Sequence, residues 1–151
     1  MLKCDDMEIH LVHYFGARNK LIVPNVSWGL GIHECDLVVM SRRGYLTEVE
    51  IKTSKSDLRA DQKKRHNHKS DKIKYLIFAI PEQIPVDYAN KYVPERAGIL
   101  VVHSQGSVEL VRRSEPNRYA VSLTIEKQYQ LARLAAIKLW ATREKVWRNN
   151  K

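Results

Sequence analysis

The beginning of the chain carries apolar side chains at the spacing of one helical face. Cys4, Met7 and Leu11 recur three or four residues apart. This spacing predicts an amphipathic helix over about residues 2–15. Glu8 interrupts the apolar face, because it lies four residues after Cys4 and three before Leu11. A carboxylate there needs a cation or a metal ion as its partner, unless it lies at the margin of the stripe and reaches water.

Two strand-like segments on either side of a short turn predict a β-hairpin over about residues 34–53. The turn residues are Ser41 to Gly44, and the flanking segments are rich in Val, Leu and Ile. Because side chains alternate along a strand, Glu48, Glu50 and Lys52 project from one face. Asp36 lies on the facing strand and points toward the same place. Two acids and a lysine in an apolar setting indicate a metal site, although a surface hairpin with cross-strand ion pairs has the same residues.

The remaining segments alternate between strand and helix patterns. The sequence predicts a strand over residues 21–26, a helix from 54 to about 66 or 68, a strand over 75–80, a loop or irregular crossover over 82–96, a second hairpin over 98–112 and a long helix over about 124–147. It shows no repeat, low-complexity segment or linker. We therefore expect one α/β domain over residues 1–151, with a mixed central β-sheet flanked by helices.

The net charge of +9 and the pI near 9.6 predict a polyanionic partner, nucleic acid first and an anionic membrane second. A basic protein without such a partner is the alternative. The charge is concentrated, because residues 52–74 hold nine Lys or Arg against three Asp, which is +6. This run directly follows the acidic residues of the hairpin, where it would attract a phosphate backbone.

Several other kinds of site find no support in the sequence. The two cysteines lack C-x-x-C spacing, which argues against a zinc ribbon, and Cys35 is interpreted as a small buried apolar residue. The histidines form no convincing ligand set, and His66 and His68 are expected to face solvent at a frayed helix end. Ser54 and Ser56 lack a matched His–Asp pair, and no phosphate-binding loop motif is present. Without a signal peptide or membrane-spanning run, we expect a cytoplasmic protein and no membrane contact.

The central hairpin has the residues for phosphodiester hydrolysis. Asp36 and Glu50 could hold Mg²⁺ or Mn²⁺, completed by the main-chain carbonyl of Ile51, waters and a phosphate oxygen. Lys52 could orient the attacking water or stabilise developing negative charge, and Glu8 could add a ligand. The expected contacts to nucleic acid come from Lys55, Arg59, Gln62, Lys63 and Lys64.

The layout resembles the PD-(D/E)XK nuclease superfamily, which has a helix with an embedded Glu, a strand with Asp, then Glu-x-Lys and a helix. Asp36 corresponds to the first acid, preceded by Cys35 where the motif's name has proline. Residues 48–63 are similar to the MmcB-like DNA-repair family, with an Asp-x-x-x-Asp-x-Lys helix matched by Asp57, Asp61 and Lys63. The resemblance implies a restriction-endonuclease-like core and Mg²⁺-dependent cleavage of DNA, in repair or in the processing of phage or mobile-element DNA.

Three alternatives to this interpretation stay open. The same fold could bind DNA without cutting it, or the protein could bind RNA or be structural, with the acids merely paired. These nucleases often work as dimers, so a homodimer is possible. In this sequence the long C-terminal helix is the one feature that marks such an interface.

Overall fold

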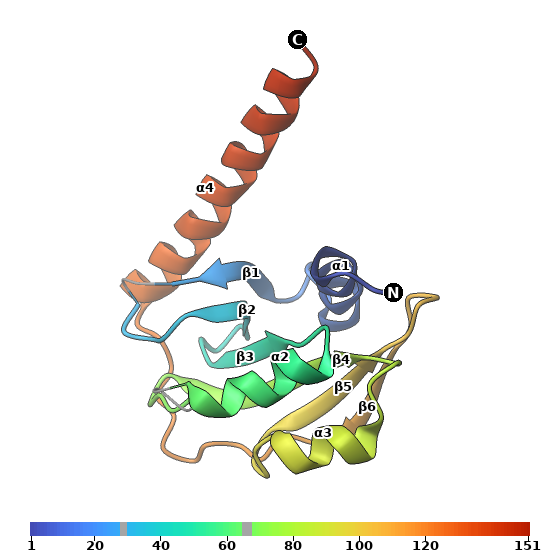
Figure 1. Cartoon of the computed structure of the whole chain (residues 1–151). Coiled ribbons are helices and arrows are strands. Elements are labelled where there is room, and N and C mark those ends of the chain that lie inside the picture. Colours follow the sequence, from blue (N-terminus) through green and yellow to red (C-terminus); the bar gives the residue numbers. More distant parts are fainter. Residues whose placement is uncertain (28–29, 65–67) are drawn as a thin grey trace.

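The computed structural model describes residues 1–27, 30–64 and 68–151. Within these ranges it contains one six-stranded sheet, in the order β1-β2-β3-β4-β5-β6, and four α-helices (Figure 1). The strands are β1 (Leu21–Val26), β2 (Cys35–Met40), β3 (Leu46–Ile51), β4 (Ile73–Pro81), β5 (Gly98–Val102) and β6 (Val108–Arg112). The helices are α1 (Cys4–Phe15), α2 (Lys55–Ala60), α3 (Val86–Tyr92) and α4 (Ile125–Asn149), with one short 3-10 helix, η1 (Asp61–Lys63).

The sheet is mixed. The pairs β1–β2, β2–β3 and β5–β6 are antiparallel, whereas β3–β4 and β4–β5 are parallel. Parallel neighbours need a crossover connection, and α2 with η1 provides the first and α3 the second. The predicted α/β fold, a mixed central sheet flanked by helices, is confirmed.

The first hairpin forms as predicted. β2 pairs with β3 so that Val38 lies opposite Glu48. The reversal is closed by Gly44, whose N–H donates to the carbonyl of Ser41 at 2.9 Å. Gly44 has φ +83°, a left-handed conformation that glycine adopts without a steric cost. The turn therefore fixes the register that sets which β3 side chains share a face.

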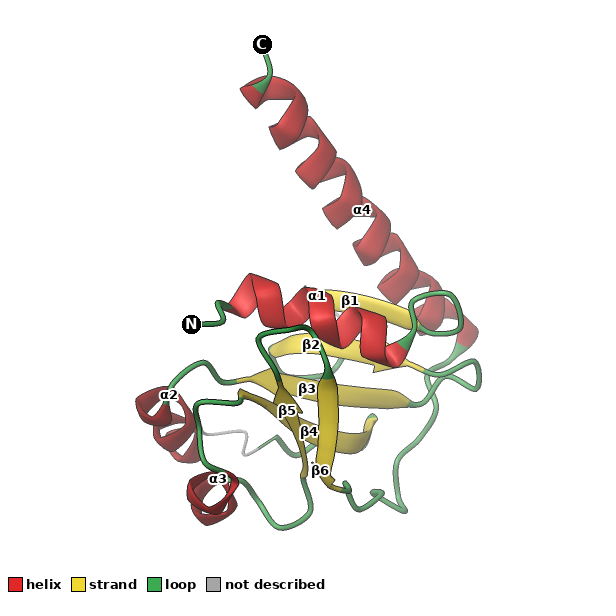
Figure 2. Cartoon of the chain, turned by 90° about the vertical axis from the view of Figure 1, so that its right-hand side faces the viewer, coloured by secondary structure: helices red, strands yellow, loops and turns green. Residues whose placement is uncertain are grey.

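Both faces of the sheet are covered. α1 lies across one face, where Met7 and Leu11 are fully buried against β2, β3 and β5 (Figure 2). On the other face, Leu58 of α2 and Ala89 of α3 pack against Phe78 and its neighbours on β4 and β5. Burial from both sides places the end of β3 in an apolar interior, where ionisable side chains require partners.

Two sequence predictions are wrong in this crossover region. Residues 82–96 contain a helix, α3, rather than only a loop. The two prolines flank this helix, because Pro85 is its N-cap and Pro94 follows the C-cap residue Val93, positions where proline costs little. The helix predicted from residue 54 to 66 or 68 is shorter. It ends with η1 at Lys63, and Lys64 is extended. Residue 66 lies outside the described part of the chain.

Only the N-terminal part of α4 packs against the domain. Leu131 is fully buried and Leu134 is half-buried beside β1 and β2, whereas every residue from 139 to 149 is exposed. Figures 1 and 2 show this helix extending away from the sheet. None of the described helices is both long and apolar enough to cross a membrane.

Candidate active site

The candidate site lies where β3 ends, beside the loop that precedes β4. β3 places Glu48 and Glu50 on one face, and Lys52 follows directly after the strand. Their relative exposures are 0%, 1% and 4%. Ionisable side chains are rarely buried this deeply without a partner, so the contacts that compensate them define the site.

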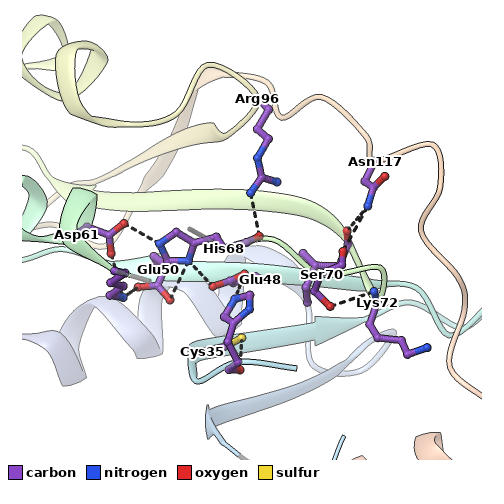
Figure 3. A network of polar contacts seen from close by, with 12 residues as sticks. Cys35, Glu48, Glu50, Asp61, His68, Ser70, Lys72, Arg96 and Asn117 are labelled. Atoms are coloured by element: carbon purple, nitrogen blue, oxygen red, sulfur yellow. Dashed lines mark hydrogen bonds and ion pairs between the residues drawn. The ribbon is translucent and has the colours of Figure 1, made fainter. Parts of the chain in front are cut away.

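Two histidines compensate Glu48. The Nε2 atom of His33 lies 2.6 Å from Oε2 of Glu48, and Nδ1 of His68 lies 2.7 Å from Oε1 (Figure 3). Burial by itself would raise the pKa of Glu48, but the hydrogen bonds with the two histidines outweigh it and hold that pKa at about 2. Glu48 is therefore an ionised carboxylate with both oxygens engaged.

His68 links Glu48 to Asp61. Its Nε2 lies 2.6 Å from Oδ2 of Asp61, and its main-chain carbonyl accepts a hydrogen bond from Arg96 at 2.8 Å (Figure 3). Its ring packs edge-on against Phe78, with centroids 5.5 Å apart. Burial opposes protonation, but the two carboxylates outweigh it and raise the pKa of His68 to about 9. The prediction that His68 faces solvent is wrong, because its side chain is a buried bridge between two acids.

Two lysines and two acids complete the cluster. The amino group of Lys52 lies 3.1 Å from Oε2 of Glu50 and 2.7 Å from Oδ1 of Asp61. Lys64 makes the same pair of contacts, at 2.8 and 2.9 Å. Burial would raise the pKa of Asp61, yet the hydrogen bonds with His68 and both lysines hold it far below its usual range. Hydrogen bonds with Glu50 and Asp61 likewise overcome burial and raise the pKa of Lys64.

Glu50 differs from the other two buried acids. Burial first, and then the charge of Asp36, raise its pKa to about 7 in spite of the two lysines. Its Oε2 receives both amino groups, whereas its buried Oε1 has no hydrogen-bond partner in the described part of the chain. Oε1 lies 3.9 Å from Nδ1 of His68, which is too long for a hydrogen bond.

Asp36 of β2 and Glu8 of α1 are the other two predicted acids. Oδ2 of Asp36 accepts a hydrogen bond from the N–H of Ile51 at 2.8 Å, which ties β2 to the end of β3. Glu8 is half-buried, and burial together with the charges of Asp5 and Asp36 raises its pKa. Asp36 thus acts electrostatically on both Glu8 and Glu50, although neither Asp36 nor Glu8 belongs to the groups of potential metal-ligand atoms within 4.8 Å in the described part of the chain.

The residues predicted to contact nucleic acid divide into two groups. Lys55, Arg59, Gln62 and Lys63 are exposed on α2 and η1. Lys55 lies over the ring of Tyr88 at 4.9 Å and leaves its charge accessible. Lys64 instead points into the cluster and holds Glu50 and Asp61. Four of the five side chains are therefore available to a phosphate backbone, and the fifth is engaged with the acids.

Sequence reasoning missed His33, His68 and Asp61 as members of the site, although Asp61 was matched to the family pattern. No local pattern marks His68, because its partners precede it by 7 and 20 residues. The available signal was Glu48 itself, a strand carboxylate with apolar neighbours that had to find a cation. The structure also assembles two mixed groups of potential ligand atoms, each within 4.8 Å, from Glu48, Glu50 and His68 and from His33, Cys35 and Glu48.

Comparison with known proteins gives one family and one related fold. The family model described as DNA repair protein MmcB-like matches residues 13–145. The solved structure of the SPO1766 protein of unknown function from Silicibacter pomeroyi aligns with a TM-score of 0.68 and 17% identity, over 99% of this chain and 94% of that one. Identity at this level shows a shared fold and nothing more. The comparison with curated proteins found no match.

Proposed function

Because the chain belongs to the DNA repair protein MmcB-like family, we propose that it is a metal-dependent DNA nuclease. Membership of that family supports a role on DNA, and hydrolysis of a phosphodiester bond is our proposal for what that role is. The substrate would be DNA undergoing repair, or phage or mobile-element DNA. Asp36, Glu50 and Lys52 are the proposed catalytic residues, with Glu8 in support.

The observation that carries this proposal is the buried carboxylate of Glu50. Burial first, and then the charge of Asp36, raise its pKa to about 7, and its Oε1 accepts no hydrogen bond from a described residue. A divalent cation beside Glu50 and Asp36 would offset both effects, and Mg²⁺ and Mn²⁺ prefer oxygen ligands. We propose Asp36, Glu50, Glu8 and the Ile51 carbonyl as its donors; of these, Glu50 also belongs to a group of potential ligand atoms within 4.8 Å in the described part of the chain, with Glu48 and His68.

In the proposed reaction the chain's own residues position the scissile phosphate and the water. A bound divalent ion would supply Lewis acidity and a more acidic water. Lys52, held by Asp61 at 2.7 Å, keeps its amino group beside Glu50, where it can orient the water or stabilise negative charge on the phosphate. The exposed cations of α2 and η1 would hold the adjacent backbone.

The ion pairs of the two lysines favour a second candidate, a DNA-binding module without cleavage. Lys52 and Lys64 already neutralise Glu50 and Asp61 inside the cluster. If these pairs persist when DNA is bound, the acids are structural and no metal enters. The two candidates differ in whether a divalent ion binds at Asp36 and Glu50.

The test combines metal binding with DNA cleavage. Asp36→Asn and Glu50→Gln are expected to reduce Mg²⁺- or Mn²⁺-dependent cleavage of labelled DNA by at least about 100-fold, because each removes a charge that acts in the transition state. Both should also weaken Mn²⁺ binding in isothermal titration calorimetry. Glu95→Gln, at an exposed acid outside the cluster, should leave both readouts unchanged.

Three results would contradict the assignment in different ways. Full metal-dependent cleavage by both variants shows that the catalytic residues lie elsewhere. Wild-type protein that binds DNA but neither binds Mn²⁺ nor cleaves supports the binding module. A preference for RNA over DNA in the same assay would identify the RNA-binding alternative.

A further inference from the structure

α4 exposes three large aromatic side chains, one in the part that packs against the domain and two in the part that extends from it. Tyr129, Trp140 and Trp147 are 68%, 65% and 56% exposed. Single exposed apolar residues are ordinary, but three large aromatic rings on one helix are not. Exposing this apolar area to water is unfavourable, and a binding partner that covers it would remove that free-energy cost.

These aromatic residues share one side of the helix. Successive residues of an α-helix are rotated by about 100°, so positions 7 or 11 apart lie nearly in line. Trp140 and Trp147 are 7 apart, and Tyr129 precedes Trp140 by 11. Leu131, the buried contact to the domain, is nine residues from Trp140 and therefore on the opposite side. The aromatic stripe, Tyr129–Trp140–Trp147, is thus directed away from the sheet.

Cations accompany the aromatic stripe. The guanidinium of Arg143 lies 5.8 Å from the ring of Trp140, and the amino group of Lys151 lies 4.1 Å from the ring of Trp147. Residues 138–151 hold five basic residues against Glu144, a net charge of +4. Aromatic faces next to flexible cations can contact bases and phosphates of one strand together.

The charge decides which partner fits this surface. A second copy of the chain would bring +4 against +4 along the paired helices, and like charges oppose such pairing. A polyanion instead gains from every one of these cations. Duplex DNA presents few free base faces, whereas unpaired bases can stack on tryptophan.

We propose that α4 is a second DNA-contacting element, which stacks Trp140 and Trp147 on unpaired bases while its cations contact the phosphates. This inference rests on the proposed DNA substrate but not on its hydrolysis. The preferred partner of α4 is then single-stranded or unpaired DNA. The exposed residues of α2 and η1 (Lys55, Arg59, Gln62 and Lys63) would make a separate contact with the DNA.

The test measures binding of a fluorescently labelled single-stranded oligonucleotide and of a matched duplex by anisotropy, in EDTA so that no cleavage occurs. Trp140→Ala with Trp147→Ala should weaken single-strand binding by at least about tenfold, because each stacked base contributes to affinity.

Leu139→Ala with Val146→Ala is the matched control. These two residues are equally exposed apolar positions at the same spacing, but lie roughly a quarter turn away from the stripe. The control pair should change single-strand binding by less than about threefold. For the duplex, the loss caused by either pair should be smaller than the loss of single-strand binding caused by the tryptophan pair.

Several outcomes overturn the inference. They are single-strand affinity unchanged by the tryptophan pair, equal losses from both pairs, or a wild-type dimer in light scattering that either pair dissociates. A cleavage assay with Mg²⁺ on the wild type and Asp36→Asn, run beside the binding assay, separates this proposal from the nuclease proposal. If the wild type does not cleave but the tryptophan effect holds, the nuclease proposal fails and this one stands. If cleavage is confirmed and the tryptophan pair binds normally, only this one fails.

Discussion

At the residue scale, the site is a chain of buried charges in which every member is set by its neighbours. His33 and His68 hold Glu48 ionised, and His68 in turn holds Asp61. Glu50 is the exception, because burial and the charge of Asp36 oppose its ionisation and its Oε1 lacks a hydrogen-bond partner among the described residues. Its ionisation is therefore the least well compensated of the three buried acids, Glu48, Glu50 and Asp61.

The buried bridge formed by His68 predicts how stability depends on pH. Folding raises the pKa of His68 from about 6.5 to about 9, so its contribution is fully present below pH 6.5 and is lost as the pH rises through 9. Wild-type protein should therefore lose up to about 3 kcal/mol of unfolding free energy across this window. Urea unfolding at pH 7.5, 8.25 and 9 checks this, on the alkaline side of the pKa of about 7 of Glu50.

His68→Gln is expected to be less stable at pH 7.5 and to show a flatter pH profile, because glutamine carries no titrating proton. His13→Gln, at an exposed position of α1, should follow the wild-type profile. Parallel profiles for the wild type and His68→Gln would show that the imidazole is not protonated in the fold.

At the element scale, the sequence predicted the bounds of a helix or strand well where one of its faces was apolar and the neighbouring turn residues were distinctive. The helix over residues 4–15 and the first hairpin are of this kind. α3 was missed because it is only seven residues long, too short for a clear helical repeat, and has a proline close to each end. The helix after β3 was predicted too long. Asp61 and Lys64 lie beyond its last α-helical turn and contact the buried cluster, and such tertiary contacts leave no local sequence pattern.

Gly44 offers a test of the turn that sets the hairpin register. Alanine there has to adopt φ +83°, and its Cβ would lie 2.6 Å from Nε2 of Gln128 and 3.2 Å from the carbonyl oxygen of Leu123. Gly16 has φ +82° with nothing within 4 Å of the added carbon. Both substitutions should cost about 1 kcal/mol from backbone strain.

Gly44→Ala should be the more destabilising of the two, by a further 1 kcal/mol or so, because the main-chain carbonyl of Leu123 cannot move aside freely. Urea unfolding of the two variants gives the difference. Equal losses would mean that the segment before α4 adjusts at no cost.

At the scale of the whole molecule, the net charge of +9 is distributed over surfaces on different elements. The exposed cations of α2 and η1 form one, and α4 carries another. The slope of log affinity against log salt for duplex DNA is negative, and removing three charges by Lys55→Gln, Arg59→Gln and Lys63→Gln should make it shallower by about 2 to 3.

The control for this experiment is a triple substitution of exposed cations away from α2, namely Arg18→Gln, Lys20→Gln and Arg42→Gln. It removes the same net charge but should leave the slope within about one unit of the wild type, because the slope counts phosphates contacted rather than total charge. Equal changes in both triple variants would show that DNA binding follows net charge alone.

The sequence by itself determined the α/β fold class, most of its elements, the family and the chemistry available along β3. Those properties depend on residue periodicity and on residues close together in the chain. Only the tertiary structure decided which charges meet. His68 lies within hydrogen-bond distance of both Glu48 and Asp61, which precede it by 20 and 7 residues, and α4 keeps its tryptophans exposed because only its first turns meet the sheet. Local patterns carry no information on either contact, since both are set by the packing of segments distant in sequence.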